Sequence, residues 1–248
     1  MLLEGKTAFI TGTRRGIGHA IAEEFAHEGC NIWAQARTQD DAFEQWAADL
    51  AQECGVTVRP VYFDMRDFAG IEQGFETVRA SGEQLDILVN VAGIMLDPIP
   101  FLETPMERIM DVFQVNFFSH VRCAQLAIPL VPRHAGASIV NIASTAGLDR
   151  SAGEVEYGTS KAAVISFTRK LATEFGPEGI RVNAVCPGVV ATDMGNSIPD
   201  EIFADMVRTS AIRRKGTTEE IAKAAAFLAS DTVPYLTGQA VQVDGGMV

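Results

Sequence analysis

The stretch TAFITGTRRGIGHAIAEEF, residues 7–25, decides the fold of this chain. Its first part, 7–12, is an apolar run that predicts a buried β-strand, and the periodicity of 16–29 predicts a helix that ends at a glycine. A glycine-rich turn joins the two. A strand followed at once by such a turn and a helix is an arrangement that can bind the phosphates of a nucleotide.

Three glycines in this turn have separate physical uses. Gly12 permits a tight turn, Gly16 lets the backbone approach a pyrophosphate, and Gly18 lets helix and strand pack closely. The helix N-terminus then offers amide donors and a partial positive charge to phosphate groups. The spacing is G-x-x-x-G-x-G, and the alternative is a tight turn without a ligand. The predicted cofactor contacts in the turn are Gly12, Arg14, Arg15, Gly16, Ile17 and Gly18.

Strand-like and helix-like segments alternate along the rest of the chain. Further strands are predicted at 31–37, 56–64, 85–93, 137–144, 181–188 and 238–246, and further helices at 40–55, 67–80, 104–130, 154–175 and 217–230. Such alternation is typical of βαβ units, which build a parallel sheet with helices on both faces. We therefore predict a single α/β domain over 1–248. The irregular stretch 188–216 is predicted to be a mobile lid over the substrate, and the alternative is a surface insertion.

Composition and charge exclude several classes of protein. The chain has 248 residues, with 20 Lys and Arg against 32 Asp and Glu, and a formal net charge of −12. This balance argues against nucleic-acid and anionic-membrane partners, which need basic side chains, and no run reaches the ~20 apolar residues of a membrane span. The cysteines form no C-x-x-C pair and no secretory signal is recognised, so we expect reduced thiols and a cytoplasmic location. No metal site is predicted.

The end of the second predicted strand bears on the choice of cofactor. Dinucleotide-binding folds place an acidic residue there for the 2′-hydroxyl of NAD, or an arginine nearby for the 2′-phosphate of NADP. This chain has Ala36 and Arg37 at that place, and Arg15 lies in the glycine turn. Two guanidinium groups can bind a phosphate dianion through charge-assisted hydrogen bonds. We predict NADP(H) rather than NAD(H); the alternative for each arginine is a solvated surface charge.

Tyr157 and Lys161 form a Y-x-x-x-K pair on one face of a predicted helix. A phenol has a pKa near ~10, and a neighbouring ammonium lowers that pKa, so the pair can exchange a proton with a substrate oxygen. Ser144 ends the fifth predicted strand, where parallel sheets bind ligands, and Asn116 lies in an apolar helical run. The alternative interpretations are a surface pair, a turn serine and a core amide with satisfied hydrogen bonds.

Several short motifs occur in order along the chain. They are T-G-x-x-x-G-I-G from Thr11, N-V-A-G from Asn90, Asn116, Ser144, Y-x-x-x-K from Tyr157, C-P-G from Cys186 and V-D-G-G from Val243. Together they make the chain resemble the short-chain dehydrogenase/reductase family over essentially its whole length, and it looks most similar to the 3-oxoacyl-acyl-carrier-protein reductases in that family. The resemblance implies a Rossmann fold with about seven parallel strands, and a homotetramer. One departure is Val91, where many members have asparagine.

The resemblance also implies roles for individual residues. Tyr157 would be the general acid/base, and Lys161 would bind the nicotinamide ribose and lower the pKa of Tyr157. Ser144 would hydrogen-bond the substrate carbonyl, and Asn116 would hold a water molecule in a proton relay. Further cofactor contacts are implied for Asp64 near the adenine, Asn90 near the adenine-side ribose, Thr192 near the nicotinamide carboxamide, and Ala92, Gly93, Pro187, Gly188 and Val190.

The reaction implied by these features is the reduction of a carbonyl by NADPH, with Tyr157 as proton donor. Two substrate classes stay open: a 3-oxoacyl thioester on an acyl carrier protein, and a small free ketone, sugar or steroid. An acidic carrier needs a basic docking patch, and the segment before the fifth predicted strand offers only Arg133 and His134. A hypothesis of another class is a non-catalytic NADP(H)-binding sensor or scaffold, which would be expected to lack Tyr157 or Lys161.

Overall fold

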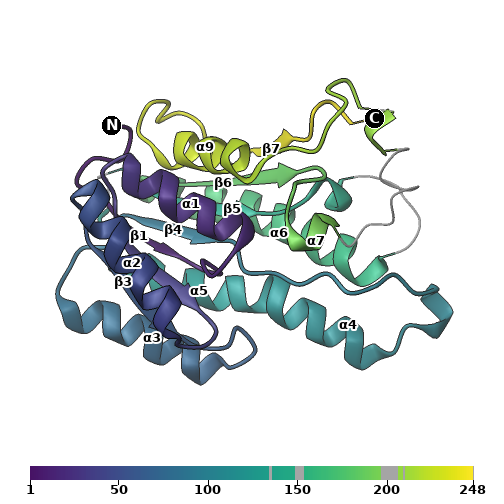
Figure 1. Cartoon of the computed structure of the whole chain (residues 1–248), viewed down its shortest axis with the longest axis horizontal. Helices are drawn as coiled ribbons and strands as arrows, with labels where there is room; N and C mark the ends of the chain where they lie inside the picture. Colours follow the sequence, from purple (N-terminus) through teal and green to yellow (C-terminus); the bar gives the residue numbers. More distant parts are fainter. Residues whose placement is uncertain (134–135, 149–153, 197–205, 209, 248) are drawn as a thin grey trace.

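One parallel sheet organises the molecule (Figure 1). The computed structural model describes the chain except for residues 134–135, 149–153, 197–205, 209 and 248. The strands are β1 (Thr7–Ile10), β2 (Asn31–Ala36), β3 (Val58–Tyr62), β4 (Ile87–Asn90), β5 (Ala137–Ile142), β6 (Ile180–Pro187) and β7 (Ala240–Val243). They lie in the order β3-β2-β1-β4-β5-β6-β7, and each pairs in parallel with its neighbours. The predicted α/β fold with seven parallel strands is confirmed.

Helices cover both faces of this sheet. They are α1 (Gly16–His27), α2 (Asp41–Cys54), α3 (Phe68–Ser81), α4 (Met106–Phe113), α5 (Ser119–Ala127), α6 (Val155–Phe175), α7 (Asp193–Asn196) and α9 (Thr218–Ala229). Figure 1 shows α1, α2 and α9 on one face and α3, α5 and α6 on the other. Successive side chains of a strand point to opposite faces, so Ile10 of β1 packs with α1 and α9, whereas its neighbour Phe9 packs with α3.

The strand order reverses direction between β1 and β4. From β1 the chain winds outward through β2 to β3, and it then returns to β4 and winds the other way to β7. In open α/β sheets the connections leaving the carboxyl ends of the two central strands diverge at such a reversal, and ligands generally bind at that edge. The glycine turn follows β1, and the Ala92–Gly93 segment follows β4.

The long helix predicted over 104–130 is divided in the structure. It starts at Met106, passes through a π-helical turn over Gln114–Phe118, continues as α5 and ends in a 3-10 turn over Ile128–Leu130. A π-helical turn holds one more residue than an α-helical turn and is common at functional sites. The prediction of a single regular helix was therefore wrong at the turn that contains Asn116.

Only part of the predicted lid over 188–216 can be described. Val190 forms an isolated parallel bridge with Gly216, and α7 lies between them in the chain. Residues 197–205 and 209 lie outside the described part, so the lid stays a prediction. Across the residues that the structure covers, no helix is both long and apolar enough to span a bilayer. All four cysteines are free thiols.

Candidate active site

The glycine turn is packed so closely that two of its positions exclude a side chain. Gly12 has φ +71°, and a Cβ there would lie 3.0 Å from the Cα of Ala92. A Cβ on Gly18 would lie 2.2 Å from the carbonyl oxygen of Gly12. Gly16, at φ +63°, faces the side chain of Thr192 at 3.6 Å. The turn is thus pressed against the segment after β4 on one side and faces the start of α7 on another.

Gln35 in β2 holds this turn in place. The Gly12 N–H donates to its Oε1 at 2.8 Å, and its Nε2 donates to the carbonyl of Phe63 at 2.7 Å. The backbone N–H of Thr13 donates to the Gln35 carbonyl at 2.9 Å. One buried amide therefore joins the glycine turn, β2 and the end of β3. Sequence reasoning missed Gln35, although a glutamine inside an apolar strand was a signal that its amide needs partners.

The N-terminus of α1 fits a phosphate-bearing cofactor. Arg15 is the N-cap residue, its side chain makes no capping hydrogen bond, and the first turn contains no acidic residue. The first backbone N–H groups of a helix lack partners inside the helix. They are available to an anion, and the helix dipole favours negative charge at this end. The turn therefore suits the pyrophosphate of a dinucleotide.

The three arginines near this helix end differ in their surroundings. Arg14 pairs with Asp40 at 2.8 Å and lies over the ring of Phe43, and Arg15 pairs with Asp193 at 3.1 Å. Arg37 directly follows β2 and is exposed. The sequence pointed to these guanidinium groups, but it did not show that Asp40 and Asp193 pair with Arg14 and Arg15.

Ser144, Tyr157 and Lys161 come together beyond the carboxyl end of β5. Tyr157 and Lys161 project from α6, and the Lys161 Nζ lies 5.8 Å from the centroid of the Tyr157 ring. The same Nζ donates to the carbonyl of Ile142, the last residue of β5, at 2.9 Å. Ser144 lies two residues further along and forms a side-chain hydrogen bond with Tyr157. The i, i+4 spacing thus places the pair on one face, as predicted.

Burial dominates the acidity of this pair. It raises the pKa of Tyr157 to about 12, against the opposing effect of the Ser144 hydrogen bond, and the charge of Glu154 raises it further. It lowers the pKa of Lys161 to about 8. The sequence expectation was a lowered phenol pKa. The structure differs because removing a phenolate from water disfavours the charged form.

Asn116 lies against the segment that follows β4. Its Oδ1 accepts from the Ile94 N–H at 2.8 Å, and its Nδ2 donates to the Ile94 carbonyl at 2.9 Å and to the Ser160 hydroxyl at 3.1 Å. A Cβ on Gly93 would lie 3.3 Å from Asn116 Oδ1 and 3.4 Å from Lys161 Nζ. Asn116, Gly93 and Lys161 therefore border one small region, although 68 positions separate the first and last in the sequence.

Other residues predicted to contact the cofactor vary in accessibility. Asn90 is fully buried, and its Nδ2 donates to Asn141 Oδ1 at 2.9 Å, so its side chain crosslinks β4 and β5. Asp64 follows β3 and accepts a hydrogen bond from the Arg66 N–H at 2.9 Å. Thr192 lies beside Gly16 and accepts from the Gly195 N–H at 3.0 Å. After β4 lie Ala92 and Gly93, which are half-buried. At the end of β6 and beyond it lie Pro187 and Val190, which are buried, and Gly188, which is half-buried.

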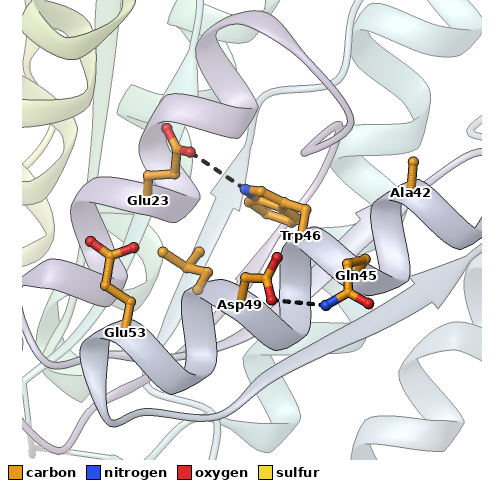
Figure 2. A pocket seen from close by; sticks show the side chains of 7 residues that line it. Glu23, Ala42, Gln45, Trp46, Asp49 and Glu53 are labelled. Carbon is orange, nitrogen blue, oxygen red and sulfur yellow. Dashed lines mark hydrogen bonds between the residues drawn. The ribbon is translucent and has the colours of Figure 1, made fainter.

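A shallow depression between α1 and α2 lies apart from these residues. Figure 2 shows its lining, which includes Glu23 from α1 and Trp46 from α2, joined by a 3.4 Å hydrogen bond. Its volume is about 390 Å³, and three carboxylates contribute to its walls. None of the predicted catalytic or cofactor residues lines it.

Comparison with known proteins identifies the family. Residues 12–248 match the family described as "Enoyl-(Acyl carrier protein) reductase". The 3-oxoacyl-[acyl-carrier-protein] reductase FabG of Chlamydia trachomatis is 36% identical, with 99% of this chain and 98% of that protein covered. A solved short-chain dehydrogenase/reductase of Serratia marcescens shares 32% identity at a TM-score of 0.92, with 99% of each chain covered.

A second solved structure bears on ligands. The L-sorbose reductase of Gluconobacter frateurii, complexed with NADPH and L-sorbose, shares 32% identity at a TM-score of 0.90, with 99% of this chain and 97% of that chain covered. Because the similarity covers nearly the full length of each chain at these identities, it shows a shared family as well as a shared fold. The seven-stranded parallel sheet agrees with it. The chain is therefore an oxidoreductase that belongs to the short-chain dehydrogenase/reductase family.

Proposed function

We propose that this enzyme reduces a carbonyl to an alcohol with NADPH, and that Tyr157 supplies the proton. The observation that carries the proposal is the position of the Tyr157 hydroxyl, hydrogen-bonded to Ser144 and one helical turn from Lys161. A nicotinamide cofactor would supply the hydride. The chain would orient the two reactants and manage the proton.

The acidity of Tyr157 suits proton donation. With a pKa raised to about 12, the phenol keeps its proton at neutral pH. The Ser144 hydroxyl would share a substrate carbonyl with Tyr157, so that a developing alkoxide receives two hydrogen bonds. The Lys161 ammonium lies within 6 Å of the phenol ring, and its charge would stabilise the phenolate left after proton transfer. Asn116 would hold a water molecule that returns a proton to this group.

Preference for NADP(H) over NAD(H) is supported by the basic side chains around the glycine turn. Arg37 is exposed at the end of β2, and Arg14 and Arg15 flank the start of α1. No carboxylate occupies position 36 to accept a ribose 2′-hydroxyl. The L-sorbose reductase named above was solved with NADPH, which agrees with this choice.

Two substrate classes compete for the site. The names of the curated relatives favour a 3-oxoacyl thioester on a carrier protein. The L-sorbose complex favours a small free carbonyl compound. The charge of this chain also favours the small compound, because Arg133 is already paired with Glu178 at 2.5 Å and the net charge is −12. His134, the other basic residue predicted for docking, lies outside the described residues.

A substrate panel separates these possibilities. NADPH oxidation would be followed with a 3-oxoacyl thioester on acyl carrier protein, the same acyl group on a short thiol, and free ketones and ketoses. Preference for the carrier-bound thioester over the short thioester identifies a carrier-protein reductase. Turnover of free carbonyls alone identifies the second class. Cofactor binding without turnover of any carbonyl would overturn the proposal and favour a sensor or scaffold.

We also propose that the chain forms a homotetramer in the cytoplasm. Exposed apolar side chains on α4 and the following π-helical turn support self-association: Met106 is 61% exposed, Met110 56% and Phe118 46%. The free thiols agree with a reducing compartment. Sedimentation velocity at micromolar concentration tests the assembly, and a monomer there would contradict it.

A further inference from the structure

A fully buried histidine lies one helical turn beyond Asn116, and none of the roles described above uses it. His120 is in α5, its exposed fraction is 0%, and its Nε2 lies 2.8 Å from the carbonyl oxygen of Ala92. A carbonyl oxygen only accepts hydrogen bonds, so Nε2 must carry the proton. The other ring nitrogen, Nδ1, is buried and has no hydrogen-bond partner among the described residues.

His120 and Asn116 together hold the backbone after β4. Their i, i+4 spacing across the π-helical turn leaves both side chains facing that segment: Asn116 binds both backbone groups of Ile94, and His120 binds the carbonyl of Ala92. From the other side, the Thr11 hydroxyl accepts from the Ala92 N–H at 3.1 Å. Gly93 lies between these anchored residues.

Gly93 lies directly beside the ammonium of Lys161. A Cβ at Gly93 would lie 3.4 Å from Lys161 Nζ, so the Ala92–Gly93 backbone forms one wall of the space around the ammonium. The ammonium is also held by its 2.9 Å hydrogen bond to the carbonyl of Ile142. A shift of the Ala92 carbonyl would move this wall towards or away from Lys161.

We propose that His120 is a positioning residue of the active site, whose Nε2–H fixes the Ala92–Gly93 wall beside Lys161. This proposal rests on the proposed function, because the position of the wall beside Lys161 affects turnover only if this site reduces a carbonyl. His120 touches neither Tyr157 nor Ser144 in the described contacts, and it acts through the backbone that it holds.

The protonation state of His120 agrees with this role. Burial, and the positive charge of Lys161 after it, lower the pKa of His120 to about 3. The ring is therefore neutral throughout the range in which proteins work, and it adds no second positive charge beside Lys161. A neutral imidazole with the proton fixed on Nε2 leaves Nδ1 as an acceptor, which a buried water could satisfy.

Two substitutions separate the hydrogen bond from the bulk of the ring. In His120→Gln, the side-chain amide can still donate to Ala92 from about the position of Nε2; in His120→Leu, the space is filled without a donor. Cys123→Ala, a buried position on the same helix, is the control for a general loss of packing in α5. Each variant would be measured for kcat and KM with the carbonyl, for NADPH affinity, and for thermal unfolding.

We expect His120→Leu to lose about tenfold to hundredfold in kcat with a smaller change in KM, since a displaced catalytic group costs rate more than binding. His120→Gln should recover most of that loss, and Cys123→Ala should keep kcat. Equal activity of His120→Leu and the parent would overturn the proposal. The proposal would also be overturned if kcat fell equally in the glutamine and leucine variants and in proportion to their loss of thermal stability. That result would mean that His120 acts only through its packing.

A spectroscopic measurement keeps this inference separate from the proposed function. In the ¹⁵N spectrum of histidine-labelled protein, the signal absent from His120→Gln should report the neutral Nε2–H form and should not titrate between pH 5 and 9. An Nδ1–H form, or titration in that range, would overturn the assignment even if the enzyme reduces carbonyls. If no carbonyl is reduced by the parent, the proposed function fails, while this measurement still decides whether Nε2 carries the proton that Ala92 accepts.

Discussion

The Asn116 side chain binds both backbone groups of Ile94, accepting from its N–H at 2.8 Å and donating to its carbonyl at 2.9 Å. A side-chain amide that pairs with a backbone in this way fixes the direction of the chain as well as its distance. The segment between β4 and α4 is irregular, and this pairing orients its first residues towards Lys161.

Tyr157→Phe tests the proton donor. The substitution removes the hydroxyl and keeps the ring, so carbonyl reduction should fall by about 10²-fold or more while NADPH affinity stays within about twofold. Steady-state kinetics and a fluorescence titration of the cofactor give the two quantities. Tyr235→Phe is the matched control, because Tyr235 is 99% exposed and should change neither. Turnover of Tyr157→Phe at the parental rate would show that another group supplies the proton.

Arg37→Asp tests the preference for NADP(H). A carboxylate at the end of β2 would repel the 2′-phosphate and accept a ribose 2′-hydroxyl, so we expect NADPH affinity to fall about tenfold or more, and NADH affinity to hold or rise. Arg79→Asp, at the exposed end of α3 on the opposite face of the sheet, makes the same change in net charge away from the turn. Unchanged NADPH affinity in Arg37→Asp would contradict the role assigned to Arg37.

The rate of carbonyl reduction should depend on pH through Lys161. Its pKa is lowered to about 8, so the side chain loses its charge as the pH rises through that value, whereas Tyr157 stays protonated until about 12. We expect kcat/KM for reduction to be highest below about pH 8 and to fall above it, and alcohol oxidation, which needs the phenolate, to rise with pH. A reduction rate that stays flat from pH 7 to 9.5, in protein that remains folded, would exclude this role for Lys161.

Gly18→Ala should damage both stability and cofactor binding. Its Cβ would lie 2.2 Å from the Gly12 carbonyl oxygen, which belongs to backbone and can move only by displacing the turn. Overpacking of this kind costs about 1–3 kcal/mol of unfolding free energy, and displacement of the turn should weaken NADPH binding as well. Chemical denaturation and cofactor titration measure the two effects.

Gly176→Ala is the control for that substitution. Gly176 has a φ of −55°, and a Cβ there would meet nothing within 4 Å. Since alanine lowers the conformational entropy of the unfolded chain, the variant should be as stable as the parent or more stable by up to about 1 kcal/mol. A Gly18→Ala variant that matches it would mean that the turn relaxes without cost.

Much of the fold could be predicted because its signals are local. Apolar runs and glycine positions located the strands, and the spacing of Tyr157 and Lys161 placed both on one helix face. The π-helical turn around Asn116 could not be predicted, because it depends on a contact with Ile94, 22 residues earlier in the chain. No local periodicity encodes such a pairing.

The missed parts of the site have the same origin. Gln35 and His120 matter because of backbone groups that the sheet brings to them, namely those of Gly12, Phe63 and Ala92. The shift of the Tyr157 pKa was misjudged for a related reason. The spacing of Tyr157 and Lys161 shows that an ammonium can lie beside a phenol. The burial that opposes ionisation of the phenol depends on the whole surrounding fold.

The extra residue in the Gln114–Phe118 turn has a geometric consequence for the helical segment as a whole. Each residue of an α-helix advances the azimuth of its side chain by about 100°, so α4 and α5 are out of phase with each other by about one residue step. Met110 and Phe118 are eight positions apart, so a regular α-helix would turn their side chains about 80° away from each other. The extra residue brings them back towards one stripe, and both are exposed. Deleting a single position inside the turn would restore a regular helix and swing Asn116 away from Ile94, which makes the length of this turn, as much as its composition, a determinant of the site.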